Sequence, residues 1–153
     1  MIVSRSADYA LRAMVFLARL DSRRYVPANE IANEMQTPPF LLSRILQQLV
    51  KGELLDSMKG HHGGFKLHRS PETISVFEII HCVDGPVVVH QCASHCGLSY
   101  DCHLKEVFAT VGKSLEASLT KVRLADLVPP RCCTVATPAK NGVRLQESLS
   151  AVE

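Results

Sequence analysis

The residues best suited to chemistry are six cysteines, all in the second half of the 153-residue chain. Three of them, Cys92, Cys96 and Cys102, fall within eleven residues. No apolar segment typical of a secretory signal stands at the N-terminus, so we expect a cytoplasmic protein whose cysteines stay reduced. A tight group of reduced cysteines favours metal or redox chemistry over a disulfide framework.

The spacing of this group favours an iron–sulfur cluster over a structural zinc ion. Zinc sites usually show two close pairs of Cys or His ligands, whereas the group contains one short pair, Cys92 and Cys96. A cluster bridges its own ligands and therefore tolerates the longer gap to Cys102. Three thiolates leave one iron in need of another ligand. Nearby histidines could supply it, although each could equally be an exposed loop residue: His90, His95 and His103.

The other three cysteines are expected to lie outside this site. Cys82 falls among apolar residues of a helical segment, which favours a place in the core. Cys132 and Cys133 follow two prolines near the C-terminus, and we interpret them as incidental because adjacent cysteines rarely bind one metal together.

Basic residues are concentrated in the first part of the chain. Residues 1–70 carry ten Lys/Arg and six Asp/Glu, a balance of +4, while residues 71–153 carry seven and nine, a balance of −2. The positive half is therefore the part to test for nucleic-acid binding. No apolar run reaches 18 residues, so we expect no membrane partner.

The elements that must position these residues begin with three helices. Apolar residues recur at helical spacing over residues 6–20, 28–35 and 38–51. Thr37, before two prolines, is typical of a helix N-cap, and Gly52 is expected to close the third helix.

A hairpin and two further helices follow. Leu54–Met58 and Phe65–His68 are strand candidates on either side of a glycine-rich loop. A capping-box pattern at Ser75–Glu78 begins a helix that stops at Gly85. A last amphipathic helix is predicted from apolar residues spaced three or four apart: Leu104, Phe108, Val111, Leu115, Leu119 and Val122.

This order predicts a mainly α protein: a winged helix-turn-helix with a two-stranded β wing and a long C-terminal dimerisation helix. In such folds the second helix of the pair enters the major groove of DNA and the wing lies along the backbone. The polar face of that helix could instead be merely solvated. Phe40 could contact a thymine methyl group or join the core, and we favour the contact with thymine. The candidate DNA contacts are Arg5, Pro39, Phe40, Ser43, Arg44, Gln47, Lys59, Gly60 and His61.

The C-terminal stripe predicts a homodimer. A winged helix uses its own apolar faces for its core, so residues 104–122 need a partner helix to cover them. We therefore expect a DNA-binding domain over residues 1–86, a cysteine-rich loop over 87–103, a dimerisation helix over 104–128 and a tail over 129–153. A two-fold dimer implies a near-palindromic operator.

About residues 1–128 together resemble the Rrf-type winged-helix repressors, the IscR/NsrR-like family, and are closest in pattern to its nitric-oxide-sensitive members. The resemblance rests on Ser6–Ala13, Phe40–Leu49, Lys59–Phe65, Ile79–Pro86, the three cysteines and Leu124–Leu127. It implies a homodimeric repressor of transcription with the long helix as the dimer interface.

The resemblance also implies how the cluster is held. Iron–sulfur regulators of the family carry a ligating histidine where this chain has Lys105, whereas the nitric-oxide sensors use an aspartate of the partner's first helix, which matches Asp8. This implies a [4Fe–4S] cluster, with [2Fe–2S] as the alternative, on Cys92, Cys96, Cys102 and Asp8. His103, His95 or solvent are the other choices for the fourth ligand, and Asp8 could simply be a carboxylate that favours the helix start.

The expected function is therefore an operator-binding repressor whose cluster senses nitric oxide, oxygen or iron–sulfur status. In this interpretation the cluster-bound protein binds the operator and the nitrosylated protein releases it. One rival keeps the fold but makes the cysteines a cluster-free thiol or disulfide switch. The other is an iron–sulfur redox protein without DNA binding. We expect no enzyme, because the chain lacks a dinucleotide-binding loop, a paired-carboxylate signature and a nucleophile elbow.

Overall fold

The computed structural model describes residues 3–20, 24–60, 63–89 and 103–129, which form a mainly helical fold with one two-stranded sheet. The fold class expected from the sequence is confirmed. In chain order the elements are α1 (Arg5–Arg19), α2 (Ala28–Glu34), α3 (Pro39–Lys51), β1 (Leu55–Met58), β2 (Gly64–Leu67), α4 (Val76–Asp84), α5 (His103–Lys121) and the 3-10 helix η1 (Leu124–Leu127).

The core forms around α1, whose inner face carries small side chains at helical spacing. Ala10 and Ala13 are completely buried, so α3, α4 and β2 can approach α1 closely. The hydroxyl of Ser4 caps the helix by accepting the N–H of Ala7 at 3.1 Å. The apolar stripe of α3 closes the core from the other side: Leu42, Ile45, Leu46 and Leu49 are all buried.

The hairpin is antiparallel, with Leu55 paired with Leu67 at one end and Met58 with Gly64 at the other. The strand bounds lie within one residue of those predicted. A third segment extends the sheet, because Val26 and Phe65 exchange two backbone hydrogen bonds of 2.9 Å. The connection between α1 and α2 therefore contacts β2 on the side opposite β1 and supports the wing.

A short antiparallel junction fastens α5 to α4. The N–H of Val76 donates to the carbonyl of Val122 at 2.9 Å, and the N–H of Leu124 donates to the carbonyl of Ile74 at 2.8 Å. Ser75 sits between them and forms the predicted capping box with Glu78. These bonds fix the C-terminal end of α5, called its root, to the residues at the start of α4.

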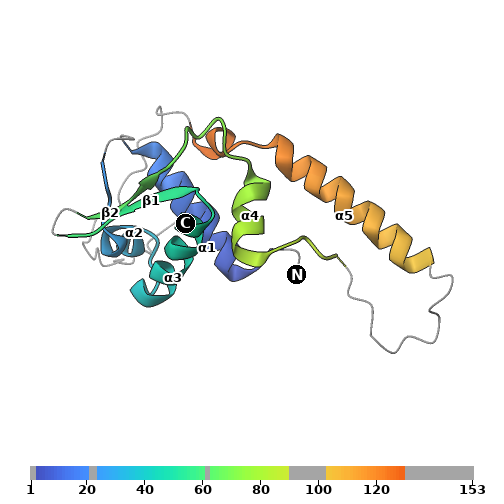
Figure 1. The fold of residues 1–153 in the computed structure, drawn as a ribbon, viewed down its shortest axis with the longest axis horizontal. Helices are drawn as coiled ribbons and strands as arrows, with labels where there is room; N and C mark the ends of the chain where they lie inside the picture. Colours follow the sequence, from blue (N-terminus) through green and yellow to red (C-terminus); the bar gives the residue numbers. More distant parts are fainter. Residues whose placement is uncertain (1–2, 21–23, 61–62, 90–102, 130–153) are drawn as a thin grey trace, which may run out of the picture.

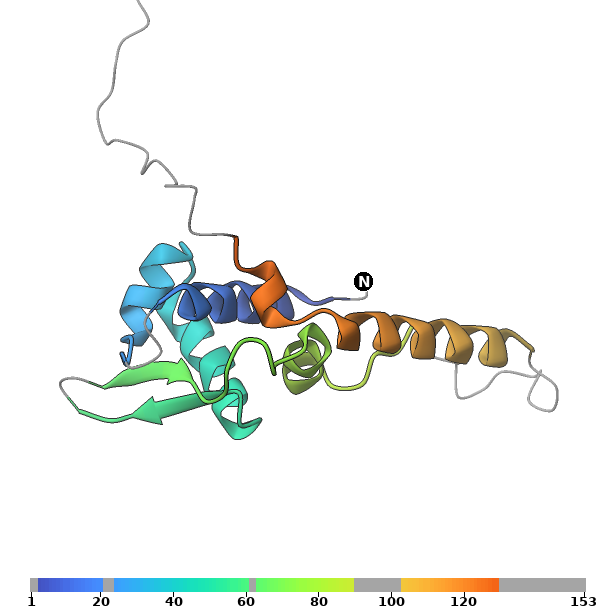
Figure 2. The ribbon, with the colours of Figure 1, turned by 90° about the horizontal axis from the view of Figure 1, so that it is seen from above.

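Figures 1 and 2 show α1–α4 and the hairpin gathered at one end of the molecule, with α5 running away from them. The hairpin and α5 extend in opposite directions, so the His103 end of α5 lies at the extremity opposite the wing. No helix among the described residues is both long and apolar enough to cross a membrane.

Candidate nucleic-acid interface

The turn between α2 and α3 sets the direction in which α3 leaves the helix pair. Gln36 adopts a left-handed conformation with φ of 49°, and the N–H of Thr37 donates to the carbonyl of Ala32 at 3.0 Å. Thr37 is buried, and its hydroxyl donates to the carbonyl of Met35 at 3.1 Å. The polar groups of this turn are thus satisfied within the turn itself.

The expected N-cap of α3 was wrong by one residue. Pro38, not Thr37, is the N-cap, and Pro39 is the first helical residue. The reason is steric, since a proline pushes the residue before it out of the helical region. Pro38 accordingly has a ψ of 125°, and the helix begins only after it.

The outward face of α3 carries the predicted base-reading side chains. Arg44 and Gln47 are exposed, and Ser43 is half-buried beside them. The helix contains no acidic residue, and Lys51 in its last turn adds a second positive charge to that of Arg44. Such a surface can approach a polyanion without like-charge repulsion.

The N-terminal end of α3 is apolar and exposed. Phe40 is 87% exposed, which excludes the alternative that it belongs to the core. Pro38 and Pro39 beside it are exposed as well. Whether Phe40 contacts thymine stays a prediction.

The wing presents a second exposed surface. Lys59 and Gly60 follow β1 and are exposed, and Gly60 has a φ of 112°, a conformation that glycine tolerates better than other residues. Gly64 lies so close to the connecting segment that an added Cβ would come within 2.3 Å of the carbonyl oxygen of Val26. His61 lies outside the described residues. Met58, which the sequence did not single out, is 43% exposed beside Lys59.

Arg5, the remaining candidate DNA contact, lies elsewhere. It opens α1 at the end held by α4, where the N–H of Ser4 donates to Asp84 Oδ2 at 2.9 Å and the Ser4 hydroxyl donates to the same carboxylate. This end of α1 is remote from the tip of the hairpin (Figure 1). A contact between Arg5 and DNA therefore stays a prediction, separate from those of α3 and the wing.

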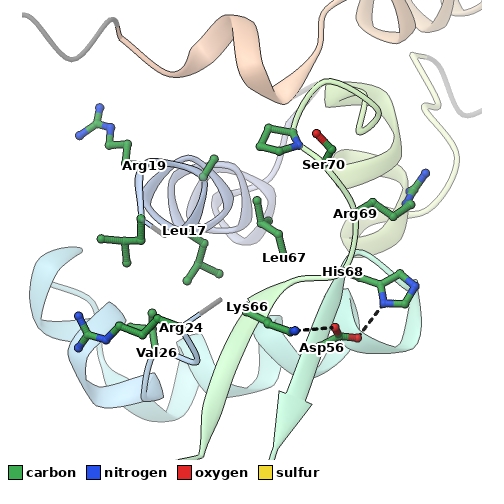
Figure 3. A pocket seen from close by; sticks show the side chains of 13 residues that line it. Leu17, Arg19, Arg24, Val26, Asp56, Lys66, Leu67, His68, Arg69 and Ser70 are labelled. Carbon is green, nitrogen blue, oxygen red and sulfur yellow. Dashed lines mark hydrogen bonds and ion pairs between the residues drawn. The ribbon is translucent and has the colours of Figure 1, made fainter. Parts of the chain in front are cut away.

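A depression of about 990 Å³ lies between the end of α1 and the base of the wing (Figure 3). Asp56, its one acidic group, is already paired, because it lies 2.7 Å from His68 Nδ1 and 3.8 Å from Lys66 Nζ. The labelled Arg19, Arg24 and Arg69 point away from its centre, toward which Leu17 and Leu67 are directed. This arrangement braces the wing and offers no convergent set of groups to a ligand.

The cysteine group Cys92, Cys96 and Cys102 lies outside the described residues, as do His90, His95, Cys132 and Cys133. Its flanks are described. The segment before it, residues 87–89, runs along the middle of α5, where an added Cβ on Gly112 would meet Val87 and Val89 at 3.8 Å. Among the described residues no group of three or more metal-ligating side chains occurs.

Asp8 and His103, the described candidates for the fourth ligand, are both accessible. The side chain of Asp8 is 50% exposed and pairs with Arg12 of the same helix at 3.0 Å. His103 begins α5, with Nδ1 3.6 Å from Glu106, and both side chains are over 80% exposed. Neither residue is held by a buried network that would prevent ligation.

Cys82 lies at the contact between α4 and the end of α3 and is half-buried against the core, as the sequence suggested. Its thiol donates to the carbonyl of Gln48 at 3.2 Å. Burial raises the pKa of this thiol, although a backbone hydrogen bond from Gly52 acts in the opposite direction. The contact also explains Gly52, since an added Cβ would come within 2.5 Å of Cys82 Sγ. Gly52 is the C-cap of α3, as expected, and Glu53 after it adopts a left-handed conformation with φ of 56°.

The predicted dimer stripe is largely uncovered in the protomer. Gly112 is the sole buried residue of α5, while Leu104 is 52% and Val111 46% exposed. Phe108, Leu115 and Leu119 are half-buried, and Leu119 packs against Ala7 and Ile80 of its own chain. Val122 lies just beyond the helix. Val107, which the stripe omitted although it stands three residues after Leu104, is 56% exposed.

The fold defined by these elements is a winged helix-turn-helix with an added long helix. The Rrf2 family, described as an iron-dependent transcriptional regulator, matches the chain over residues 3–130. The chain therefore belongs to the Rrf2 family of transcriptional regulators.

Individual relatives agree with this assignment. An rrf2-like HTH-type transcriptional regulator of Rhodobacter capsulatus is 30% identical over 138 residues, covering 83% of this chain and 92% of the relative. The HTH-type transcriptional regulator NsrR of Bacillus licheniformis is 30% identical over 123 residues, covering 78% and 84%. The structure of T. potens IscR is similar with a TM-score of 0.66 and 29% identity, covering 83% and 85%. The expectation that the chain is not an enzyme agrees with these relatives.

Proposed function

We propose that this regulator is a homodimeric repressor that binds a near-palindromic operator through α3 and the wing. The observation that carries the proposal is the outward face of α3, which is exposed, free of acidic residues and supplied with Arg44 and Gln47. Arginine can donate two hydrogen bonds to guanine, and glutamine can pair with adenine. The exposed Lys59 of the wing is suited to phosphates of the DNA backbone.

Base reading and backbone binding can be separated by two substitutions. Arg44→Ala should weaken binding to the operator by about 5- to 150-fold, the value of one bidentate base contact, and should weaken binding to random DNA much less. Lys59→Ala should weaken both and reduce the dependence of affinity on salt. Lys121→Ala, which removes a positive charge from the last turn of α5, is the matched control.

The measurement is fluorescence anisotropy with duplexes from the protein's own upstream region and with scrambled duplexes, at three salt concentrations. Equal losses on both duplexes for Arg44→Ala would contradict base reading by this residue. Unselective binding by the wild-type protein would contradict the function itself.

The dimer follows from α5. A helix whose exposed apolar residues include Leu104, Val107 and Val111 loses solvent-accessible apolar surface when it packs against a second copy. Two copies related by a two-fold axis would also present two α3 helices to two half-sites of one operator. Size-exclusion chromatography with light scattering at micromolar concentration tests this, and a monomer would contradict it.

We further propose that the site holds an iron–sulfur cluster on Cys92, Cys96 and Cys102 of one subunit and Asp8 of the other. The donor set fits such a group chemically, because thiolates are the usual ligands of iron in clusters. The carboxylate of Asp8 is half-exposed, and ligation would break only its surface ion pair with Arg12, which is weak. When bound, the cluster would supply iron that reacts with nitric oxide or oxygen.

The placement of Asp8 favours a second copy as the source of the carboxylate. Within one chain, the first turn of α1 lies beside α4, whereas His103, which directly follows Cys102, lies at the free end of α5 (Figures 1 and 2). A ligand that bridges these regions most simply joins two subunits. Asp8 lies on α1, and α1 packs directly against α3. A change in the position of Asp8 would therefore move the helix against which the DNA-reading helix α3 rests.

Anaerobic reconstitution of Asp8→Ala beside wild type tests this ligand. We expect the Asp8→Ala protein to have an altered absorption spectrum and to lose iron faster than wild type on exposure to nitric oxide. Absorption spectroscopy and native mass spectrometry measure the two effects. Arg12→Ala is the matched control, since it removes the ion pair but keeps the carboxylate. An Asp8→Ala protein with the same cluster mass, the same kinetics and unchanged operator affinity would contradict the assignment. A wild-type protein purified anaerobically without iron or sulfide would favour the cluster-free thiol switch.

A further inference from the structure

Phe40 is the most exposed large apolar side chain among the described residues, at 87%. Four of the other exposed apolar residues lie on α5 or directly after it, namely Leu104, Val107, Val111 and Val122, where a second subunit would cover them. Phe40 stands at the opposite end of the molecule, in the first turn of α3 (Figure 1). Its exposure therefore needs a different partner.

The end of α3 that carries Phe40 is poorly suited to phosphate. Helix N-termini bind anions through free backbone N–H groups. Here Pro38 and Pro39 occupy the N-cap and the first helical position, and neither has an N–H to donate. No side chain caps this end either. The terminus thus presents three exposed apolar residues, Pro38, Pro39 and Phe40, and lacks two of the four free N–H groups of an ordinary helix start.

The charge around this apolar end indicates a polyanion that also offers an apolar group. Arg44 lies one turn further along α3 on the exposed side, and the helix has no acidic residue. In the major groove of DNA, the C5-methyl group of thymine is the apolar feature of the base edges, and aromatic side chains contact it.

We infer that Phe40 is a specificity-determining residue that selects thymine in the operator through its methyl group. This inference rests on the proposed DNA-binding function and deepens it. Four residues of helix span about 6 Å, and successive base pairs lie about 3.4 Å apart. The selected thymine should therefore lie within about two base pairs of the guanine that Arg44 reads.

The experiment removes the methyl group from the DNA and the ring from the protein. A high-affinity duplex is first selected from a randomised library with the full-length, anaerobically purified protein. Each thymine is then replaced singly by deoxyuridine, which lacks only the methyl group, and dissociation constants are measured for wild type, Phe40→Ala and Lys59→Ala.

One deoxyuridine position per half-site should weaken wild-type binding about fourfold, the value of burying one methyl-sized group. Phe40→Ala should lose this sensitivity at that position, whereas Lys59→Ala should bind both duplexes more weakly with the fourfold ratio unchanged. Because Phe40 is exposed, the thermal unfolding of Phe40→Ala should match that of wild type.

Two results would overturn the inference while leaving the proposed function intact: no methyl-sensitive thymine for the wild type, or the same sensitivity in Phe40→Ala. Either would leave the apolar end of α3 as a surface for a protein partner. A library that yields no enriched duplex would contradict the proposed function and the inference together.

Discussion

The winged-helix part and α5 use apolar residues in opposite ways. In α1–α4 and the hairpin, apolar side chains turn inward, and Met14, Leu46 and Ile79 are completely buried. In α5 the apolar side chains are exposed or half-buried, and Leu119, near the C-terminal end, is the one that packs against Ala7 and Ile80 of its own domain. A sequence with two comparable apolar stripes thus builds one closed core and one uncovered helix. The difference supports the proposal that the first region folds on its own contacts, whereas α5 would be completed by a second copy.

The largest expected effect is on the free energy of unfolding, and it should distinguish the winged-helix part from α5. Leu46→Ala should lower the free energy of unfolding by about 2–5 kcal/mol, because it leaves a cavity under α3. Leu104→Ala, at a site that is 52% exposed on α5, should cost far less in the protomer. Urea unfolding followed by circular dichroism measures both, and comparable losses would remove the distinction between a closed and an uncovered region.

A second prediction concerns the backbone bridge between Val26 and Phe65, which supports the wing. Gly64→Ala should cost about 1–3 kcal/mol, since the added Cβ collides with the backbone of Val26 and must displace the bridge between Val26 and Phe65. Gly60→Ala is the matched control, because no atom lies within 4 Å of its added Cβ and only its positive φ opposes the change. If the two variants unfold alike, crowding at Gly64 has no energetic weight.

The junction between the two regions should show a pH dependence. Burial tends to raise the pKa of Glu78, but hydrogen bonds from Arg69 and from Ser75 outweigh it and hold the pKa below its usual value. A depressed pKa contributes stability that is complete above the unfolded-state pKa, about 4.3, and is lost as the pH falls through the folded-state pKa.

Glu78→Gln should therefore lower the free energy of unfolding by about 0.2–1 kcal/mol at pH 7, the range of a partly exposed ion pair. The difference from wild type should begin to shrink as the pH falls below about 4.3 and should be lost as the pH falls through the lower folded-state pKa, because the wild-type carboxyl then becomes protonated. Urea titrations from pH 3 to pH 7 provide the measurement. A difference that is constant over this range would mean that the charge of Glu78 is not involved.

The smallest effect on the protomer should come from α5 itself. Val111→Glu should change the stability of an isolated protomer by less than about 0.5 kcal/mol but should prevent association, because a charge would be buried between two apolar helices. Light scattering should report a monomer, and the melting temperature should no longer rise with protein concentration. Ala117→Glu, at an exposed site outside the stripe, should remain a dimer. Dimers for both variants would place the interface elsewhere.

Most of the fold could be predicted because it depends on local patterns. The apolar stripe of α3, the capping box at Ser75 and the glycine-rich hairpin are each encoded within about ten residues, and all appear where expected. Two features that the sequence did not predict depend on contacts between segments, which a local pattern does not contain. Gly52 is small because Cys82 approaches it from another helix, and the bridge between Val26 and Phe65 joins segments far apart in sequence.

The candidate sites were predictable to different extents. The exposed positions of Arg44, Gln47 and Lys59 follow from helical spacing and the hairpin loop, and the structure places them on accessible surface. Their base and phosphate contacts depend on DNA and stay predictions. In the proposed arrangement the cysteine group depends on a cofactor and a second subunit, so neither the pattern of one chain nor its internal packing determines the ligand set.

The backbone attachment of α5 near its C-terminal end gives the helix the geometry of a lever arm. Its root is fixed by the backbone hydrogen bonds that join Val122 to Val76 and Leu124 to Ile74, while the other end is His103. Nineteen helical residues span about 28 Å, so a tilt of about 5° at the root moves the far end by about 2.5 Å. Such a movement at the far end exceeds the length of a metal–ligand bond. The attachment of α5 thus converts slight changes of angle beside Ser75 into displacements of chemical size at the cysteine end of the helix.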